Sequence, residues 1–204
     1  MSYNYPVLFA KIVDAVTETG SITARMHQLI KHCEEQVPHE DWDGMRQIDY
    51  EADRQTLGRW LVTSFAEADP WLLFKGLWFG IHNLDVRGQS TADIYVSAST
   101  KFEPKSLDWA VAAEFFPDAR YLNSTVLASI YRLAYTRPTS LGNDAEYPLS
   151  LAYGAMAACA ALHSARFTGP FAHLVGAAAG FDDGDLLFLG SFSEGKFCAM
   201  PEAG

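Results

Sequence analysis

Four residues in the C-terminal half of the chain carry side chains that could do chemistry. Asn143, Asp144, Glu146 and Tyr147 place an amide, two carboxylates and a phenol within five residues, just before a long apolar segment. Two carboxylates can act as general acid and base when their separation in space is suitable. An irregular loop before a helix also exposes backbone donors, so Asn143, Asp144 and Tyr147 are candidate ligand-binding residues.

The same stretch is also typical of the beginning of a buried helix. The residue before a proline avoids the α region, so Tyr147 should be extended and Pro148 should be the first helical residue. Asp144 and Glu146 would then lie just outside the helix, where carboxylates favour its positive end and accept backbone hydrogen bonds. The sequence leaves both interpretations, a ligand site and a helix start, open.

A histidine at the end of an apolar run offers a base for the same carboxylates. His82 ends the run "WLLFKGLWFGIH", and Asp93 lies near the start of the next apolar run. If this region and the later loop met in one pocket, Asp144, Glu146 and His82 would be the catalytic residues of a small hydrolase-like enzyme. Turn chemistry alone also explains polar residues at a strand end. The chain has no GxSxG, GxxxxGK[ST], GxGxxG or HExxH motif, so catalysis is the alternative hypothesis rather than the main one.

The strongest charge signal is an acidic stretch between residues 34 and 53. It contains eight carboxylates against the single basic residue Arg46. Such a concentration of like charge attracts cations and steers basic partners, although a solvated acidic loop that only aids solubility has the same composition. Trp42, within "HEDWDGM", is either a buried local anchor or an exposed hot spot. We predict that a basic protein partner binds at Glu40, Asp41, Trp42, Asp43 and Asp49.

One local group of soft ligands raises the question of a metal site. His27, His32, Cys33 and His39 lie close in the sequence, but His27 and His32 are five residues apart and fall on different faces of a helix. No second cluster supplies further ligands. We therefore predict no metal and no cofactor.

The overall composition limits the partner and the compartment. A net charge of −10 argues against nucleic acid and anionic membrane surfaces, which require a basic face. Three cysteines without a CxxC pair favour a reducing environment. The N-terminus lacks a basic leader, and the apolar run at residues 149–162 is short and interrupted by Ser150, as in a core helix. These features together predict a cytoplasmic protein.

The hydrophobic periodicity predicts a single α+β domain spanning residues 1–204. Helical patterns cover residues 7–19, 22–36, 50–68, 106–116, 123–135 and 148–166. Strand patterns cover residues 71–85 and 91–102, and then 171–181 and 186–192, with each pair joined by a polar turn. We therefore expect an antiparallel sheet of about four strands in two hairpins, packed against about six helices.

Charge, size and the missing catalytic motifs favour binding over catalysis. The main functional hypothesis is a non-catalytic, acidic cytoplasmic protein that binds a basic protein, for example a toxin-neutralising immunity protein. The alternative is the small enzyme of unknown substrate described above.

Overall fold

The computed structural model describes residues 3–66, 68–86, 89–104, 106, 108–182 and 184–200. The helices are α1 (Tyr5–Thr17), α2 (Ile22–Gln36), α3 (Trp42–Arg46), α4 (Arg54–Phe65), α5 (Asp108–Val111), α6 (Thr125–Ala134) and α7 (Asn143–Ser164), and a 3-10 turn, η1, spans Gly169–Phe171. The strands are β1 (Gly76–Val86), β2 (Gln89–Ser99), β3 (Tyr121–Leu122), β4 (Gly176–Phe181), β5 (Leu186–Ser193) and β6 (Lys196–Ala199). The α+β character expected from the sequence is confirmed.

The sheet differs from the expected one in size and in direction. Both predicted hairpins form: Phe79 pairs with Val96 in β1 and β2, and Ala179 pairs with Leu187 in β4 and β5. The described strands form a six-stranded sheet in the order β3-β2-β1-β4-β5-β6, and β1 and β4 run parallel at its centre. The expectation of about four antiparallel strands was therefore wrong. The two hairpins meet through a long helical crossover, which local patterns do not specify, and β3 is too short to show a period.

The helices follow the hydrophobic pattern except where tertiary contacts intervene. The helix predicted for residues 22–36 is confirmed, and α1 begins two residues before the predicted start. The helix predicted for residues 106–116 is only the four-residue α5, because Phe115 pairs with Ala98 at the edge of β2. Among the described residues, none of the helices combines the length and hydropathy that a membrane crossing requires.

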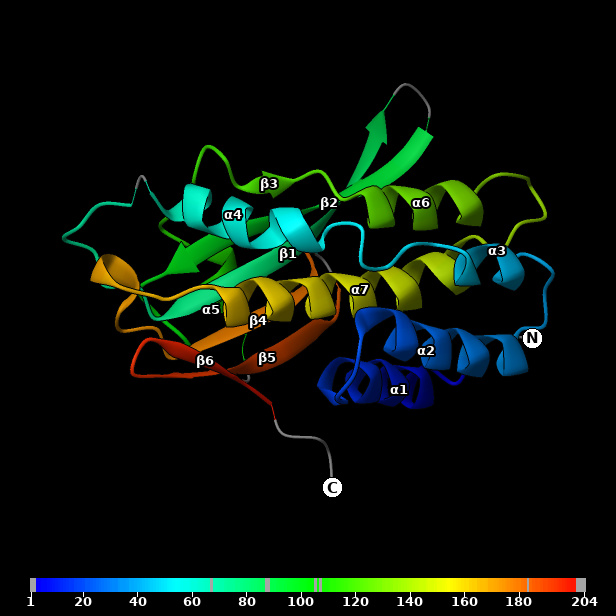
Figure 1. Ribbon diagram of the computed structural model, residues 1–204, viewed down its shortest axis with the longest axis horizontal. Coiled ribbons are helices and arrows are strands. Elements are labelled where there is room, and N and C mark those ends of the chain that lie inside the picture. Colours follow the sequence, from blue (N-terminus) through cyan, green and yellow to red (C-terminus); the bar gives the residue numbers. More distant parts are fainter. Residues whose placement is uncertain are drawn as a thin grey trace.

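The helical layer covers one face of the sheet. In Figure 1, α4, α6 and α7 lie across the sheet, while α1 and α2 lie beside α7 and the β1–β2 hairpin extends beyond the helices. Alternate residues of β1, including Phe79 and Ile81, are buried toward α7. Gly154 permits this close packing, because a Cβ there would lie 2.8 Å from the Ile81 side chain. The opposite face carries Trp78, packed with Trp109 of α5.

A buried carboxylate joins three of these helices. Asp53, 3% exposed, precedes α4 and accepts hydrogen bonds from the Ser124 hydroxyl at the start of α6 (2.6 Å) and the Tyr153 phenol of α7 (2.9 Å). Its other oxygen accepts from the Thr125 backbone amide (3.1 Å) and hydroxyl (2.7 Å). Burial raises the pKa of Asp53, but these donors outweigh it and hold the pKa below its ordinary value. Asp53 therefore belongs to the interior rather than to an acidic surface.

We expect Asp53→Asn to lower the free energy of unfolding by about 1–3 kcal/mol at pH 7, because an amide nitrogen cannot accept these hydrogen bonds. A depressed pKa contributes stability above the unfolded-state value of about 3.9, and this contribution is lost as pH falls through the folded-state pKa. The difference between wild type and variant should therefore shrink below about pH 4. Urea unfolding at pH 7 and pH 3 measures this difference in stability. The control is Asp118→Asn, which removes an exposed carboxylate. An equal difference at both pH values would contradict the assignment.

Candidate functional site

The acidic segment is built around a buried tryptophan. The Trp42 side chain is 0% exposed, and its Nε1 donates to the Val37 carbonyl oxygen at 2.8 Å. Of the two roles that the sequence left open for Trp42, the structure shows the local anchor. Trp42 fixes the short helix α3 in a region expected to be a loop, so the acidic segment is an ordered surface.

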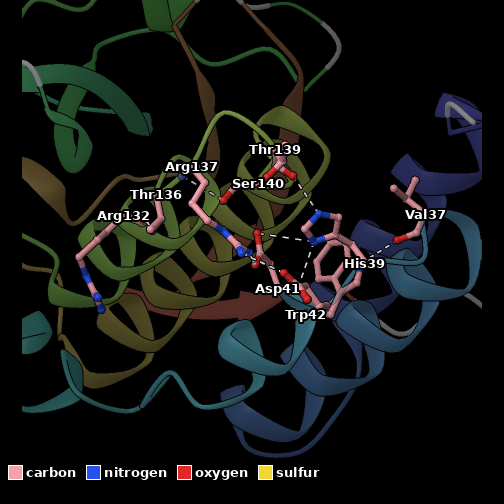
Figure 2. A network of polar contacts seen from close by, with 10 residues as sticks. Val37, His39, Asp41, Trp42, Arg132, Thr136, Arg137, Thr139 and Ser140 are labelled. Carbon is pink, nitrogen blue, oxygen red and sulfur yellow. Dashed lines mark hydrogen bonds and ion pairs between the residues drawn. The ribbon is translucent and has the colours of Figure 1, made fainter.

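An arginine from a distant loop holds the same segment. Arg137, between α6 and α7, donates from Nη2 to Asp41 (Figure 2). Its Nη1 donates to Glu40 Oε1 at 2.9 Å. These two carboxylates raise the pKa of Arg137, with the Glu40 hydrogen bond as the largest cause. Burial raises the pKa of Asp41, but the Ser140 hydroxyl and the Arg137 charge outweigh it and leave the pKa below its ordinary value. No local sequence pattern predicts this contact, since 97 residues separate Glu40 from Arg137.

A histidine makes a second connection between these two loops. His39 Nε2 lies 2.9 Å from the Thr139 carbonyl oxygen, and His39 Nδ1 accepts from the Asp41 backbone amide at 3.1 Å (Figure 2). A carbonyl oxygen can only accept and a backbone amide can only donate, so this geometry fits an Nε2–H that donates to Thr139 and an Nδ1 that accepts from Asp41. His39 thus serves the local backbone rather than a metal.

Ion pairs reduce the charge that the acidic segment presents. Arg46 pairs with Asp43 (2.9 Å) and with Glu34, and Arg54 lies 3.6 Å from Glu51. Several carboxylates nevertheless reach solvent: the Glu40 side chain is 74% exposed and that of Asp43 is 90% exposed. Asp49 is also exposed. Of the five predicted partner-binding residues, Glu40, Asp43 and Asp49 therefore face solvent, whereas Asp41 and Trp42 form the support beneath them.

The stretch from residue 143 to 147 lies inside a helix. Helix α7 begins at Asn143 after Gly142, whose φ of 55° is in the left-handed region, and no side chain caps its N-terminus. The prediction that Pro148 begins the helix was wrong, as was the expectation that Asp144 or Glu146 caps it. The Tyr147 phenol contacts the Asp185 carboxylate, whereas Glu146 contacts the phenol of Tyr131, so the two neighbours do not form one site.

A distant tyrosine compensates for the proline within this helix. Pro148 has no amide hydrogen to donate to the carbonyl oxygen of Asp144, four residues before it. Tyr3 takes that place, because its phenol donates to the Asp144 carbonyl oxygen at 2.8 Å. The N-terminal segment thereby stabilises the first turns of α7, and the helix can begin five residues earlier than the proline suggested.

We expect Tyr3→Phe to lower the free energy of unfolding by about 0.5–1.5 kcal/mol, the usual value of one hydrogen bond. The same change should cost less in a Pro148→Ala background, because the new amide can then donate to Asp144. A double-mutant cycle by urea unfolding measures this coupling. Additive effects of the two substitutions would show that Tyr3 stabilises the protein by packing alone.

Glu146 is a buried carboxylate in a network of phenols. It is 7% exposed, and it accepts from the Tyr131 phenol at 2.6 Å and from the Tyr135 phenol at 3.3 Å. Tyr131 also lies 2.5 Å from the Asn83 side-chain amide of β1. Tyr131 has one proton, so when it donates to an ionised Glu146 the Asn83 amide must turn its NH₂ group toward the phenol oxygen. Burial raises the pKa of Glu146 despite the two phenol donors.

We expect Glu146→Gln to be at least as stable as wild type at pH 8, because glutamine keeps the shape and removes a poorly solvated charge. A raised folded-state pKa contributes stability below the unfolded-state value of about 4.3, and that stability is lost as pH rises through the folded-state pKa. The free energy of unfolding of wild type should therefore rise relative to that of the variant as pH falls from 8 to 4.5. Urea unfolding across this range measures the change, and a stability difference independent of pH would contradict the role given to Glu146.

The three predicted catalytic residues are not brought together. His82 and Asn83 are neighbours on β1 and point to opposite faces of the sheet. Asn83 contacts Tyr131 of α6, the phenol bound to Glu146, whereas His82 Nδ1 lies 3.7 Å from Asp182 Oδ2 on the other face. Asp93 is the partner of His82 in the β1–β2 register, and burial raises its pKa even though the charge of His82 opposes this. The sequence indicated that Asp93 lies near His82 but did not indicate Asp182, which the parallel pairing of β1 with β4 brings next to His82.

Comparison with protein-family models, with curated proteins and with solved structures found no match.

Proposed function

We propose that this protein is a non-catalytic cytoplasmic binding protein that engages a basic protein partner through Glu40, Asp43 and Asp49. The observation that carries the proposal is the fixed geometry of this acidic surface, with Trp42 buried beneath it and Arg137 paired to Glu40 and Asp41. A toxin-neutralising immunity protein is a concrete example of this class.

Preorganisation favours binding by such a surface. The connection between α2 and α3 is held by the Trp42 indole, the His39 contact with Thr139 and the Arg137 ion pairs. A partner therefore meets carboxylates that already have defined positions, and less conformational entropy is lost on binding. A flexible acidic loop serving only solubility would not require these contacts.

The residual charge of the surface favours a basic partner. Seven carboxylates besides the buried Asp53 fall between residues 34 and 53, against Arg46 within that segment and Arg54 and Arg137 paired to it from outside. Carboxylates that share one arginine still repel one another, and docked cations relieve this repulsion. The long-range attraction also raises the association rate and weakens as salt rises.

We expect the triple variant Glu40→Gln, Asp43→Asn and Asp49→Asn to weaken binding of the native partner. Affinity capture from native cells at low salt, with mass spectrometry, identifies basic candidates, and purified candidates are then measured against wild type and variant at several salt concentrations. The association rate should fall by roughly three- to tenfold at low salt, with a smaller salt dependence, because these charges steer the encounter.

The matched control carries Glu103→Gln, Asp108→Asn and Asp118→Asn, which remove the same charge from exposed positions outside the acidic segment. This control should bind nearly as wild type does. Equal weakening by both variants would show that only the overall charge matters, and unchanged binding by the first variant would exclude this surface as the interface.

A further inference from the structure

One buried oxygen of the acidic segment has no hydrogen-bond donor. Asp41 Oδ1 is paired with Arg137, but Asp41 Oδ2 is buried and accepts no hydrogen bond in the part of the chain that the structure describes. Buried carboxylate oxygens usually have a donor. His39 Nδ1 lies 3.5 Å from this oxygen, so a proton on that nitrogen would supply the missing donor.

The same nitrogen of His39 serves as an acceptor in the structure. The Asp41 backbone amide donates to Nδ1 at 3.1 Å, while Nε2 lies 2.9 Å from the Thr139 carbonyl oxygen (Figure 2). A protonated imidazole is a donor at both nitrogens, so the contact with Thr139 can persist but the hydrogen bond from the Asp41 amide cannot. Nδ1 therefore has two alternative partners on one residue, the amide of Asp41 when His39 is neutral and its carboxylate when His39 is charged.

The charges around His39 leave its own proton as the variable. Asp41 faces His39 within the connection from α2 to α3, and Arg137 reaches the other oxygen of that carboxylate from the loop between α6 and α7. Glu40 is also paired with Arg137. Neighbouring polar groups hold the pKa of Asp41 below its ordinary value despite its burial, so Asp41 stays ionised while a histidine changes charge between about pH 5 and 8. Uptake of one proton by His39 thus exchanges one hydrogen bond for the other.

This exchange acts on the acidic surface because Asp41 immediately precedes α3. Loss of the hydrogen bond to Nδ1 releases the backbone at the entry to the helix that carries Asp43. The proton also adds one positive charge beside Asp41 and close to Glu40. Both effects oppose the docking of a basic protein, since the surface becomes less preorganised and less negative. The His39 side chain is 26% exposed, so protons reach it from solvent.

We propose that His39 is a proton-operated switch that weakens the binding of a basic partner by the acidic surface at low pH. This regulation rests on the proposed function, because it acts on the surface formed by Glu40, Asp43 and Asp49. Protonation and binding are linked: the partner binds more tightly when His39 is neutral, so a bound partner opposes proton uptake by His39. Affinity is therefore highest above the pH range in which His39 titrates and falls as pH decreases through it.

The first test follows the switch in wild-type protein without a partner. NMR spectra between pH 8 and pH 5 record the ring signals of His39 and the backbone amide signal of Asp41, and hydrogen exchange measures the protection factor of that amide. The amide signal should shift with the midpoint of the His39 titration. Its protection factor should fall by roughly threefold or more below that midpoint, because one hydrogen bond is lost. An Asp41 amide that does not follow the His39 titration would overturn the switch.

Matched asparagine variants show which histidine is responsible. His39→Asn keeps an acceptor for the amide two residues on, as in an Asx turn, but has no site for the proton. It should abolish the pH-dependent step of the Asp41 amide. His173→Asn, at an exposed position outside the acidic segment, should leave the step unchanged. A step that persists in His39→Asn would contradict the proposal, and the wild-type titration decides the question even where a variant fails to fold.

The second test measures the regulation with hexalysine as a defined basic probe. Calorimetry at low salt should show that wild type binds hexalysine more weakly at pH 5.5 than at pH 7.5, by roughly threefold or more, and that His39→Asn removes most of this difference. The triple variant Glu40→Gln, Asp43→Asn and Asp49→Asn should bind weakly at both pH values.

The two variants separate the regulation from the interface. If the triple variant binds weakly but His39→Asn keeps the pH difference of wild type, the switch is overturned and the interface stands. If the triple variant binds hexalysine as wild type does, the proposed interface is refuted, and the NMR titration shows independently whether the switch exists.

Discussion

The burial of helix α7 is the constraint on which the rest of the structure depends. This 22-residue helix packs against α1, α2, α4 and α6 and against strands β1 and β4, so it has almost no solvent-exposed face between its first and last turns. Small residues such as Gly154 and Ala157 make this possible, since neighbouring elements can approach its backbone closely. Polar groups buried on α7 consequently need partners inside the protein, although Ser150 Oγ has none in the part of the chain that the structure describes. Asp53 accepts a hydrogen bond from Tyr153 of α7, and Tyr131 donates one to Glu146 of α7. Tyr3 donates one to the carbonyl oxygen of Asp144.

The two carboxylates in this interior show how local donors decide ionisation. Burial disfavours the charged form of both Asp53 and Glu146. Asp53 accepts hydrogen bonds from three hydroxyl groups and a backbone amide, and its pKa is lowered. Glu146 has only two phenol donors, one of them at 3.3 Å, and its pKa is raised. Number and geometry of donors, rather than depth alone, thus distinguish a stabilising charge from a costly one.

The acidic segment gains its form from the same principle of internal pairing. Half of its carboxylates share Arg46 or Arg137, so the surface is less charged than the composition indicates. The pairing also fixes the positions of the exposed carboxylates above the buried Trp42. An ordered, moderately acidic surface is better suited to specific recognition of a basic protein than a flexible and fully charged one, because binding then costs less entropy.

The sequence by itself determined the α+β class, helix α2 and both hairpins, because each depends on periodicity within a short segment. It also located the acidic segment and the polar stretch at residues 143–147. Only the tertiary structure decided the parallel pairing of β1 with β4, the contact of Arg137 with Glu40 and the start of α7 before Pro148. It likewise placed His82 and Glu146 on opposite faces of the sheet. Each of these depends on groups that lie far apart along the chain, whose contacts are set by the packing of whole elements and leave no trace in local patterns.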